Sequence, residues 1–278
     1  MLKATRIKVY IAHLLYKFVR IFKRDTNVIV TRRGIKYSLD LTEGIDLSVY
    51  LSGGFQNHLF SPKIRIKEND TILDVGANCG VISLNFAKRH PESTVYSFEP
   101  TDFAFSKLLV NLDLNKDTIK NVIPVKAFIS DSDKDTDNFD IYSSWKVDNI
   151  DKEKVHPTHM GIKKSATNVP VFQIDTFVNK QKIEKVGFIK IDTDGYEWGV
   201  LNGAAETIKR DRPYLIFEVG AYLLEEKHQS FKSFIEYFHE KKYTLFTSDF
   251  RTLITLSNYK KIIPADYTID VFAMPEEK

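Results

Sequence analysis

The stretch TILDVGANCG, residues 71–80, constrains the fold of this chain more than any other. Residues 71–75 form a short β-prone run, and an apolar pattern with helical spacing begins at Val81. Between them, Gly76 and Gly80 allow the backbone to turn sharply and to approach a ligand. A strand, a glycine turn and a helix in this order present backbone N–H groups at the end of a parallel strand, where nucleotides bind.

Two carboxylates indicate which nucleotide this is. Asp74 lies just before the turn, where it can take the amino group of a bound amino acid. Glu99 follows Gly80 by nineteen residues and ends a second strand run, 94–98, where a carboxylate accepts hydrogen bonds from both ribose hydroxyls. The turn lacks the middle glycine of G-x-G-x-x-G that admits a pyrophosphate, which argues against NAD. A ligand with an amino-acid end and a ribose end is S-adenosylmethionine.

A third motif, IKIDTDGYE, covers residues 189–197 and holds Asp192, Asp194 and Glu197. Carboxylates this close repel one another, so that one is protonated or a cation neutralises them. A divalent cation on Asp192 and Asp194 that orients a deprotonated hydroxyl is one alternative. Capping of the following helix by Asp194, without chemistry, is another. Methyl transfer to a hydroxyl requires alignment and a base for the proton, and we expect Asp192 to lie beside the transferred methyl group.

With these three motifs and the following Gly203-Ala204, the chain resembles the FkbM family of class I methyltransferases, from about residue 41 to about residue 274. The resemblance implies an α/β, Rossmann-like fold with a mostly parallel sheet and an antiparallel last strand, here preceded by a helix and a hairpin. It also implies an S-adenosylmethionine-dependent O-methyltransferase that acts on a hydroxyl of a saccharide or a secondary metabolite. Gln56 and Asp194 depart from the family pattern, which has a carboxylate and a glutamate at these positions.

The sequence and the resemblance together give a set of expected site residues. Asp131 follows the third strand run, 122–128, where a polar side chain reaches the adenine amino group, although a turn aspartate is the alternative. The expected catalytic residues are Asp192, Asp194 and Glu197. The expected cofactor-binding residues are Asp74, Gly76, Ala77, Asn78, Gly80, Glu99, Pro100, Asp131 and Asp192.

We expect the chain to divide into three segments. Residues 1–26 form a basic amphipathic helix, residues 27–62 form a hairpin and a loop that covers the cofactor, and residues 63–278 form the methyltransferase domain. Within this domain, residues 132–170 are polar and charge-rich, and we interpret them as an insertion that acts as a substrate lid. His156 and His159 lie in it, but two ligands without a convergent carboxylate do not define a metal site, and we interpret them as solvated histidines.

The N-terminal segment differs in charge from the rest of the chain. Residues 1–24 contain seven basic residues and no acidic one, whereas the remainder has 33 basic and 37 acidic residues, a net charge of −4. The body is therefore not a nucleic-acid-binding surface.

The N-terminal helix is not expected to span a membrane, because Lys17 and Arg20 interrupt its apolar run. It has no small-residue cleavage site, so a signal peptide is not expected either. The helix either lies on an anionic membrane or packs on protein. Val9, Tyr16 and Val19 interrupt the polar face of the helix, which favours packing on more than one side. The apolar face is made by Ile7, Tyr10, Ile11, Leu14, Phe18, Ile21 and Phe22.

The single cysteine, Cys79, excludes an internal disulfide and a cysteine-based zinc site. We expect Cys79 to be a small buried side chain that fills space beneath the turn. We also expect a cytoplasmic protein, which is peripheral to the membrane if the N-terminal helix binds lipid.

Two other classes of function stay open. One is an NAD-dependent oxidoreductase, and the other is a non-catalytic methyltransferase fold that serves as a membrane or partner module. The oligomeric state is left undecided.

Overall fold

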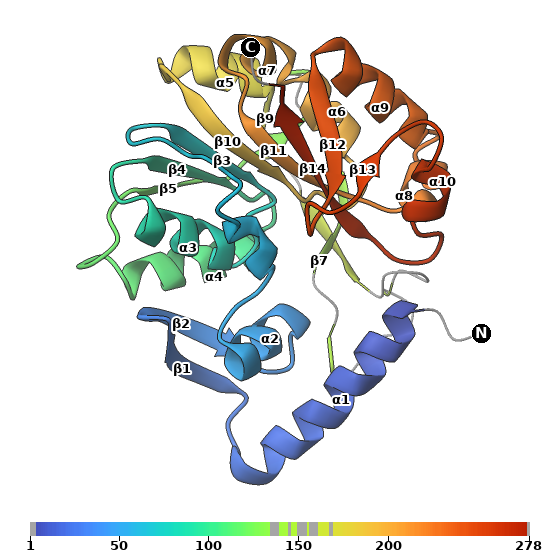
Figure 1. The fold of residues 1–278 in the computed structure, drawn as a ribbon. Coiled ribbons are helices and arrows are strands. Elements are labelled where there is room, and N and C mark those ends of the chain that lie inside the picture. Colours follow the sequence, from blue (N-terminus) through green and yellow to red (C-terminus); the bar gives the residue numbers. More distant parts are fainter. Residues whose placement is uncertain are drawn as a thin grey trace.

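A computed structural model describes residues 4–133, 139–143, 146–148, 155, 161–166 and 169–276. At its centre is an eight-stranded sheet in the order β13-β12-β14-β11-β10-β3-β4-β5 (Figure 1). Neighbours among β3, β4, β5, β10 and β11 pair in parallel, and β14 is antiparallel to both β11 and β12. The expected mostly parallel sheet with a reversed last strand is therefore confirmed. The strands are β3 (Thr71–Val75), β4 (Thr94–Phe98), β5 (Val122–Val125), β10 (Val186–Ile191), β11 (Tyr214–Val219), β12 (Tyr243–Thr247), β13 (Leu253–Ile254) and β14 (Ile269–Pro275).

The direction of strand progression reverses at β3. The chain runs from β3 to β4 and β5 on one side and then returns to β10, which pairs with the other side of β3. At such a switch point the loops that leave the carboxyl ends diverge in opposite directions and open a crevice. Every residue of β3 and β10 is buried, as expected for parallel strands that are covered on both faces.

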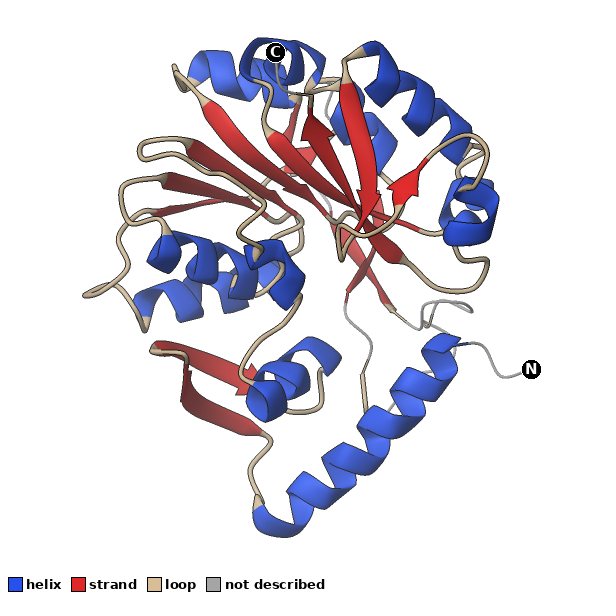
Figure 2. Ribbon diagram, in the orientation of Figure 1, coloured by secondary structure: helices blue, strands red, loops and turns tan. Residues whose placement is uncertain are grey.

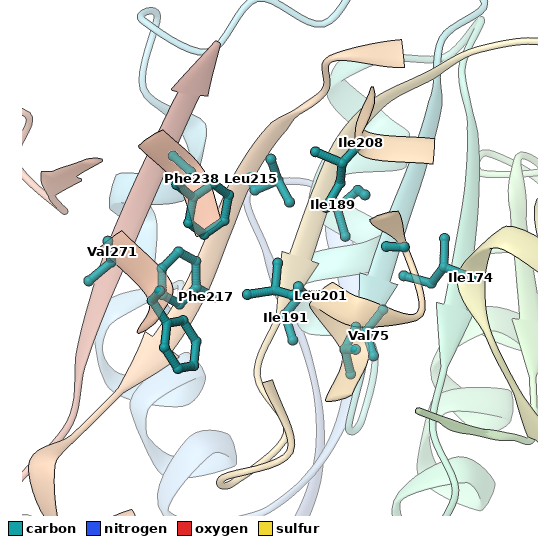
Figure 3. Packing of buried hydrophobic residues seen from close by; sticks show 14 of the residues in the cluster. Val75, Ile174, Ile189, Ile191, Leu201, Ile208, Leu215, Phe217, Phe238 and Val271 are labelled. Carbon is teal, nitrogen blue, oxygen red and sulfur yellow. The ribbon is translucent and has the colours of Figure 1, made fainter. Parts of the chain in front are cut away.

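Helices cover both faces of the sheet (Figure 2). Figure 3 shows the core on one face, where Val75, Ile191 and Phe217 from adjacent strands pack with Leu201 and Phe238 from the covering helices. The opposite face has its own buried cluster, which includes Ile72, Phe86 and Phe188. The helices of the domain are α3 (Val81–Arg89), α4 (Asp102–Asp113), α5 (Ile174–Lys180), α6 (Glu197–Asn202), α7 (Ala205–Asp211), α8 (Ala221–Glu226), α9 (Phe231–Glu240) and α10 (Tyr259–Ile262).

Three elements differ from the sequence-based expectation. The helix expected from Tyr196 is broken into α6 and α7 at Gly203, where a Cβ atom would lie 2.1 Å from the carbonyl oxygen of Ser130. The third strand ends at Val125, and the following β6 (Phe128–Ile129) pairs with β9 (Val171–Phe172) outside the main sheet. A helix, α2 (Gly44–Ser52), occupies the segment that was expected to be loop.

The N-terminal elements lie along one side of the domain (Figure 1). They are α1 (Ala4–Phe22), the antiparallel pair β1 (Asn27–Arg32) and β2 (Ile35–Asp40), α2, and the short 3₁₀ helix η1 (Asn57–Phe60). The expected N-terminal helix and hairpin are therefore confirmed. Asn111 on α4 and Asn115 just after its end hold β2, because their side-chain oxygens accept hydrogen bonds from the amides of Ser38 and Lys36, respectively. Within the described ranges, no helix has both the length and the apolar character needed to cross a bilayer.

Between β6 and β9, the insertion contains the antiparallel strands β7 (Phe139–Ser143) and β8 (Ile162–Ala166). Its described residues touch the N-terminal elements: the amide of Val147 donates to the carbonyl of Thr42, and Lys146 lies 3.6 Å from the Glu43 carboxylate. His156 and His159 lie outside the described residues. The division of the chain into three segments and the lid function of residues 132–170 stay predictions.

Candidate active site

A cavity of about 360 Å³ opens at the carboxyl ends of β3, β4, β10 and β11. The turn after β3 and the residues after β4 form one wall, and the loop after β10 forms another. Helix α2 and the segment that follows it cover the cavity and contribute Gly44, Ile45, Ser48, Phe55 and Gln56. The cavity thus lies at the switch point of the sheet, where the sequence placed a cofactor.

The turn after β3 depends on a glycine at position 76. Gly76 has φ +78°, and a Cβ atom there would lie 1.8 Å from the carbonyl oxygen of Asp192. This close approach joins the ends of β3 and β10, because the amide of Asp192 donates to the carbonyl of Val75 at 3.0 Å. Gly80 also has positive φ, +82°, and forms the N-cap of α3. The structure leaves Gly80 out of the cavity lining, whereas Gly76, Ala77 and Asn78 belong to it.

The amides of this turn are not available to a ligand, contrary to the expectation from the sequence. The amides of Gly76 and Ala77 both donate to the carbonyl of Phe98, at 3.0 and 2.9 Å. The amide of Asn78 donates to Glu99 Oε2, that of Cys79 to Asn78 Oδ1, and that of Gly80 to the carbonyl of Ala77. All five N–H groups are therefore satisfied within the protein. The turn offers a close-fitting backbone surface instead of an anion-binding nest.

Glu99 is 5% exposed and lines the cavity beside Pro100. Its Oε1 accepts hydrogen bonds from the amide and the hydroxyl of Thr101, at 2.9 and 2.6 Å, and its Oε2 accepts one from Asn78 at 3.0 Å. Burial raises the pKa of Glu99, while these hydrogen bonds act in the opposite direction. Because a carboxylate oxygen can accept two hydrogen bonds, Oε2 retains capacity for a ligand hydroxyl.

Asp74, which was expected to bind the amino group of the cofactor, does not lie in the cavity lining. Its side chain is fully buried; Oδ2 accepts a hydrogen bond from Ser83 Oγ at 2.6 Å, and Oδ1 lies 3.1 Å from Lys190 Nζ. Lys190 also donates to the carbonyl of Gly76 at 2.6 Å and lies 3.6 Å from Asp192. Burial acts to lower the pKa of Lys190, but the carboxylates of Asp74 and Asp192 outweigh it, so that this pKa is raised. Asp74 thus neutralises a lysine under the turn.

Lys190 lines the cavity as well, although no role was expected for it from the sequence. The signal was present, since Lys190 is the only polar side chain in the otherwise apolar run 186–191 of a doubly covered strand. A lysine there requires a buried counter-charge. Its partner Asp74, however, lies 116 residues earlier in the chain.

In the loop after β10, Asp192 and Asp194 line the cavity and Glu197 does not. Glu197 Oε1 accepts hydrogen bonds from the amide and the hydroxyl of Thr193, both at 2.9 Å, and from the amide of Gly195 at 3.2 Å. Glu197, which was expected to be catalytic, therefore holds the loop in shape and does not border the cavity. Asp194 has φ +52° and does not cap α6, whose N-cap is Tyr196 without a side-chain hydrogen bond.

Two carboxyl groups of the cavity have strongly shifted pKa values. Burial raises the pKa of Asp194 well above its ordinary value, and repulsion from Asp192 and Glu197 adds to the effect. Burial likewise raises the pKa of Glu218 at the end of β11, with repulsion from Asp192 and Asp194. Glu218 Oε1 accepts a hydrogen bond from Thr268 Oγ1 at 2.6 Å. Shifts of this kind are typical of groups that exchange protons during catalysis.

Glu218 was not among the residues expected from the sequence. It occupies the place on β11 that Glu99 occupies after β4, as a lone carboxylate near the carboxyl end of a buried strand. Asp131, in contrast, was expected at the adenine and lies outside the lining. The short β6 pairs with β9 and leads Asp131 to an exposed position, where its carbonyl accepts a hydrogen bond from Gln173.

Cys79 is buried, and burial together with the nearby Asp46 raises the pKa of its thiol to about 12. The thiol is therefore protonated at neutral pH and is not a nucleophile. In the part of the chain that the structure describes, no group of three or more His, Cys, Asp or Glu side chains is arranged to hold a metal ion.

Comparison with known proteins gives the chain a family. The family described as methyltransferase FkbM domain matches residues 74–245. Methyltransferase 1 of Beauveria bassiana is 24% identical over 151 residues, which cover 49% of this chain and 59% of that protein. The hexuronic acid methyltransferase AglP of Haloferax volcanii is 25% identical over 155 residues, which cover 56% of this chain and 58% of that protein. The chain thus spans less than two thirds of the length of these two relatives.

Among solved structures, a methyltransferase FkbM from Methylobacillus flagellatus aligns with a TM-score of 0.48 and 15% identity, over 79% of this chain and 48% of that one. Methanocaldococcus jannaschii TYW2, solved in complex with AdoMet, aligns with a TM-score of 0.43 and 16% identity, over 90% of this chain and 86% of that one. The family match spans more than half of the chain and includes the turn, Glu99 and the loop after β10. The protein therefore belongs to the FkbM methyltransferase family.

Proposed function

We propose that the protein transfers a methyl group from S-adenosylmethionine to a hydroxyl group of a saccharide or secondary-metabolite acceptor. The observation that carries this proposal is the charge of the cavity. Four carboxyl groups line it, those of Glu99, Asp192, Asp194 and Glu218, while Lys190 is the one Lys or Arg among its described lining residues. Lys190 is already paired with Asp74. A cationic sulfonium fits these surroundings.

The described residues offer a place for each part of this cofactor. Glu99 would accept hydrogen bonds from the ribose hydroxyls, with Pro100 beside it, and Phe128 and Ile129 provide apolar surface for a base. The backbone of Gly76, Ala77 and Asn78, together with Asp192, would hold the amino-acid end. Asp74 and Gly80 would act indirectly, by pairing with Lys190 and by shaping the turn.

When bound, S-adenosylmethionine supplies a methyl group that is already activated, so the protein has to align the acceptor, exclude water and accept a proton. Asp194 and Glu218 are suited to accept the proton, because burial and repulsion from neighbouring carboxylates raise their pKa values and so make their ionised forms stronger bases. Gln56 donates to Asp192 Oδ2 at 3.3 Å, and its own Oε1 is buried with no hydrogen-bond partner among the described residues. This oxygen is a ready acceptor for a substrate hydroxyl.

The same charge distribution indicates the class of acceptor. Among the described lining residues the only Lys or Arg is Lys190, which is already paired with Asp74, so an anionic acceptor would find no free counter-charge there, whether or not Asp194 and Glu218 are protonated, whereas a neutral or an amino-bearing acceptor needs none. AglP is named for a hexuronic acid, which is anionic. We infer that this protein differs from that relative in its acceptor. Gly161 of the insertion also lines the cavity, which supports residues 132–170 as the segment that covers the acceptor.

The alternative classes find less support. A dinucleotide would bring its pyrophosphate to a turn whose amides are all satisfied and to walls that are rich in carboxylates. A non-catalytic module would not require buried carboxyl groups around a cavity, since unneutralised burial of such groups costs stability. Neither alternative accounts for Glu99, Asp194 and Glu218 together.

The test is transfer of labelled methyl groups from S-adenosylmethionine to three matched acceptors: a neutral hexoside, an amino-hexoside and a hexuronic acid. We expect transfer to the first two and little to the third. Asp194→Asn and Glu218→Gln should each lower kcat, by on the order of 10²-fold or more for the residue that accepts the proton. Glu206→Gln, on the exposed face of α7, is the matched control. Preferred transfer to the hexuronic acid would contradict the acceptor class, and unchanged kcat in both variants would contradict the assigned base.

A further inference from the structure

Helix α1 has two apolar faces, and only one of them is covered by the described residues. Val9, Tyr16 and Val19 are buried, and Tyr16 and Val19 belong to the same cluster as residues of β2 and α2. Polar contacts hold this side as well: His13 Nδ1 lies 2.7 Å from the carbonyl of Val147, and Tyr16 donates to Asp148 at 3.3 Å. The helix is therefore fixed on the body of the protein by its smaller apolar face.

The second face consists of seven large apolar side chains that are 43–73% exposed. At 100° per residue they cover about 140° of the helix circumference without a polar interruption. Isolated apolar residues on a surface need no explanation, but a continuous stripe of this size marks an interaction site. The stripe comprises Tyr10, Ile11, Leu14, Leu15, Phe18, Ile21 and Phe22.

The charges beside the stripe identify what covers it. Lys17 lies at its edge, Lys23 and Arg24 follow its end, and residues 1–24 contain no acidic residue. A second copy that paired helix to helix would place these positive charges opposite one another. An anionic lipid surface complements both the apolar stripe and the charges. We propose that α1 docks the protein onto an anionic bilayer, with the helix lying in the plane of the interface.

This position would bring the cavity to the membrane. Helix α1 packs on α2, and Gly44, Ile45 and Ser48 of α2 line the cavity. Residues 146–148, which α1 holds through His13 and Tyr16, belong to the insertion that also contributes Gly161 to the lining. A lipid-bound α1 would thus hold two walls of the cavity near the headgroups. Docking is tested without methyl transfer, so its outcome does not depend on the proposed reaction.

The experiment is co-sedimentation of the full chain with vesicles of phosphatidylcholine, with and without phosphatidylglycerol. We expect binding to the anionic vesicles that weakens as salt is raised. The double substitution Phe18→Glu/Ile21→Glu should reduce partitioning by at least about tenfold, because two large side chains lose their burial. Lys17→Glu/Lys23→Glu should reduce it roughly fivefold for each lost charge. Leu256→Glu is the control, since Leu256 is 52% exposed and lies in a loop far along the chain from α1.

Thermal unfolding of each variant shows whether the fold is intact, and the charge variant decides the question if the apolar variant does not fold. Absence of binding to anionic vesicles, or equal binding by a folded Phe18→Glu/Ile21→Glu variant, would overturn the proposal. So would a dimer in sedimentation equilibrium that the same double substitution dissociates, in a protein that does not bind vesicles. That result would identify a second copy as the occupant of the stripe.

Discussion

Lys190 links β3 and β10, the two central strands of the site, by ion pairing with carboxylates of β3 and of the loop after β10. Its ammonium group lies between Asp74 on β3 and Asp192 after β10, and it donates to the carbonyl of Gly76 in the turn. Both Lys190 and Asp74 are almost completely buried. A lysine in this place holds the turn and the loop after β10 in a fixed relation, which is a requirement for aligning two substrates.

Replacing Lys190 by Met should therefore lower the free energy of unfolding by roughly 3–5 kcal/mol, because the Asp74 carboxylate would stay buried without its counter-charge. Urea denaturation measures the effect. Lys116→Met is the control: Lys116 pairs with Asp113 on the surface, and both side chains are more than 60% exposed, so no measurable change is expected. Equal stability of Lys190→Met and the wild type would refute the pairing.

The raised pKa of Asp194 also predicts how stability depends on pH. A carboxyl group whose pKa is higher in the folded chain binds more protons when folded, so the free energy of unfolding falls as pH rises from the ordinary carboxyl value through the raised one. Asp194→Asn removes this loss. The variant should lose less stability than the wild type as the pH is raised above the ordinary carboxyl value, as measured by urea denaturation. Parallel curves for the two proteins would show that the pKa of Asp194 is not raised.

Among the individual site residues, the sequence could locate those that a local pattern places at the end of a strand. Spacing placed Glu99 at the end of the second strand, and the sheet order that the family resemblance implies placed Asp192 beside the first turn; the structure puts both in the cavity lining. The sequence could not identify the partner that neutralises the charge of a side chain or accepts its hydrogen bonds. Asp74 and Lys190 pair across 116 residues, and Glu197 turns back to its own loop. Such choices are made by three-dimensional neighbours, so they leave no local pattern.

At the scale of the elements, the turn between β3 and α3 contains two glycines that are required for different reasons. Both Gly76 and Gly80 have positive φ, which costs an L-residue roughly 1–2 kcal/mol. A Cβ atom at position 76 would in addition meet the backbone oxygen of Asp192 at 1.8 Å, whereas one at position 80 would meet a side-chain methyl group of Leu108 at 2.4 Å. The first neighbour cannot move without separating β3 from β10.

Gly76→Ala should consequently destabilise the protein by more than about 4 kcal/mol, and Gly80→Ala by roughly 1–2 kcal/mol. Differential scanning calorimetry of the two variants gives the comparison directly. A similar loss in both would mean that φ alone sets the requirement. It would then remove the argument that Gly76 is needed for the contact between the turn and the loop after β10.

Element positions could be predicted well where burial is uniform and less well where packing breaks a pattern. The sequence marked β3 and β4 correctly, as the runs 71–75 and 94–98. It missed the break at Gly203, which arises because the helix approaches the carbonyl of Ser130. It also missed α2, since Gly44 and Gly53 read as loop residues, although Gly53 in fact ends the helix with φ +74°.

For the whole molecule, the sheet order explains how distant motifs form one site. The turn, Glu99, the loop after β10 and Glu218 lie on strands that are neighbours in space, although they span residues 74–218 of the chain. The order itself followed from the family resemblance, because periodicity does not determine which strands pair. The sequence did indicate that α1 packs on more than one side, because Val9, Tyr16 and Val19 interrupt its polar face, and all three are buried.

The central claim is that the cavity binds S-adenosylmethionine through Glu99, and calorimetric titration of the full chain tests it most directly. We expect binding of S-adenosylmethionine and none of NAD. Glu99→Ala should weaken the former by about 1.5–3 kcal/mol, the value of a hydrogen bond to a charged group. Asp131→Ala, outside the lining, is the control that should bind as the wild type does. Binding of NAD alone, or unchanged affinity in Glu99→Ala, would contradict the account.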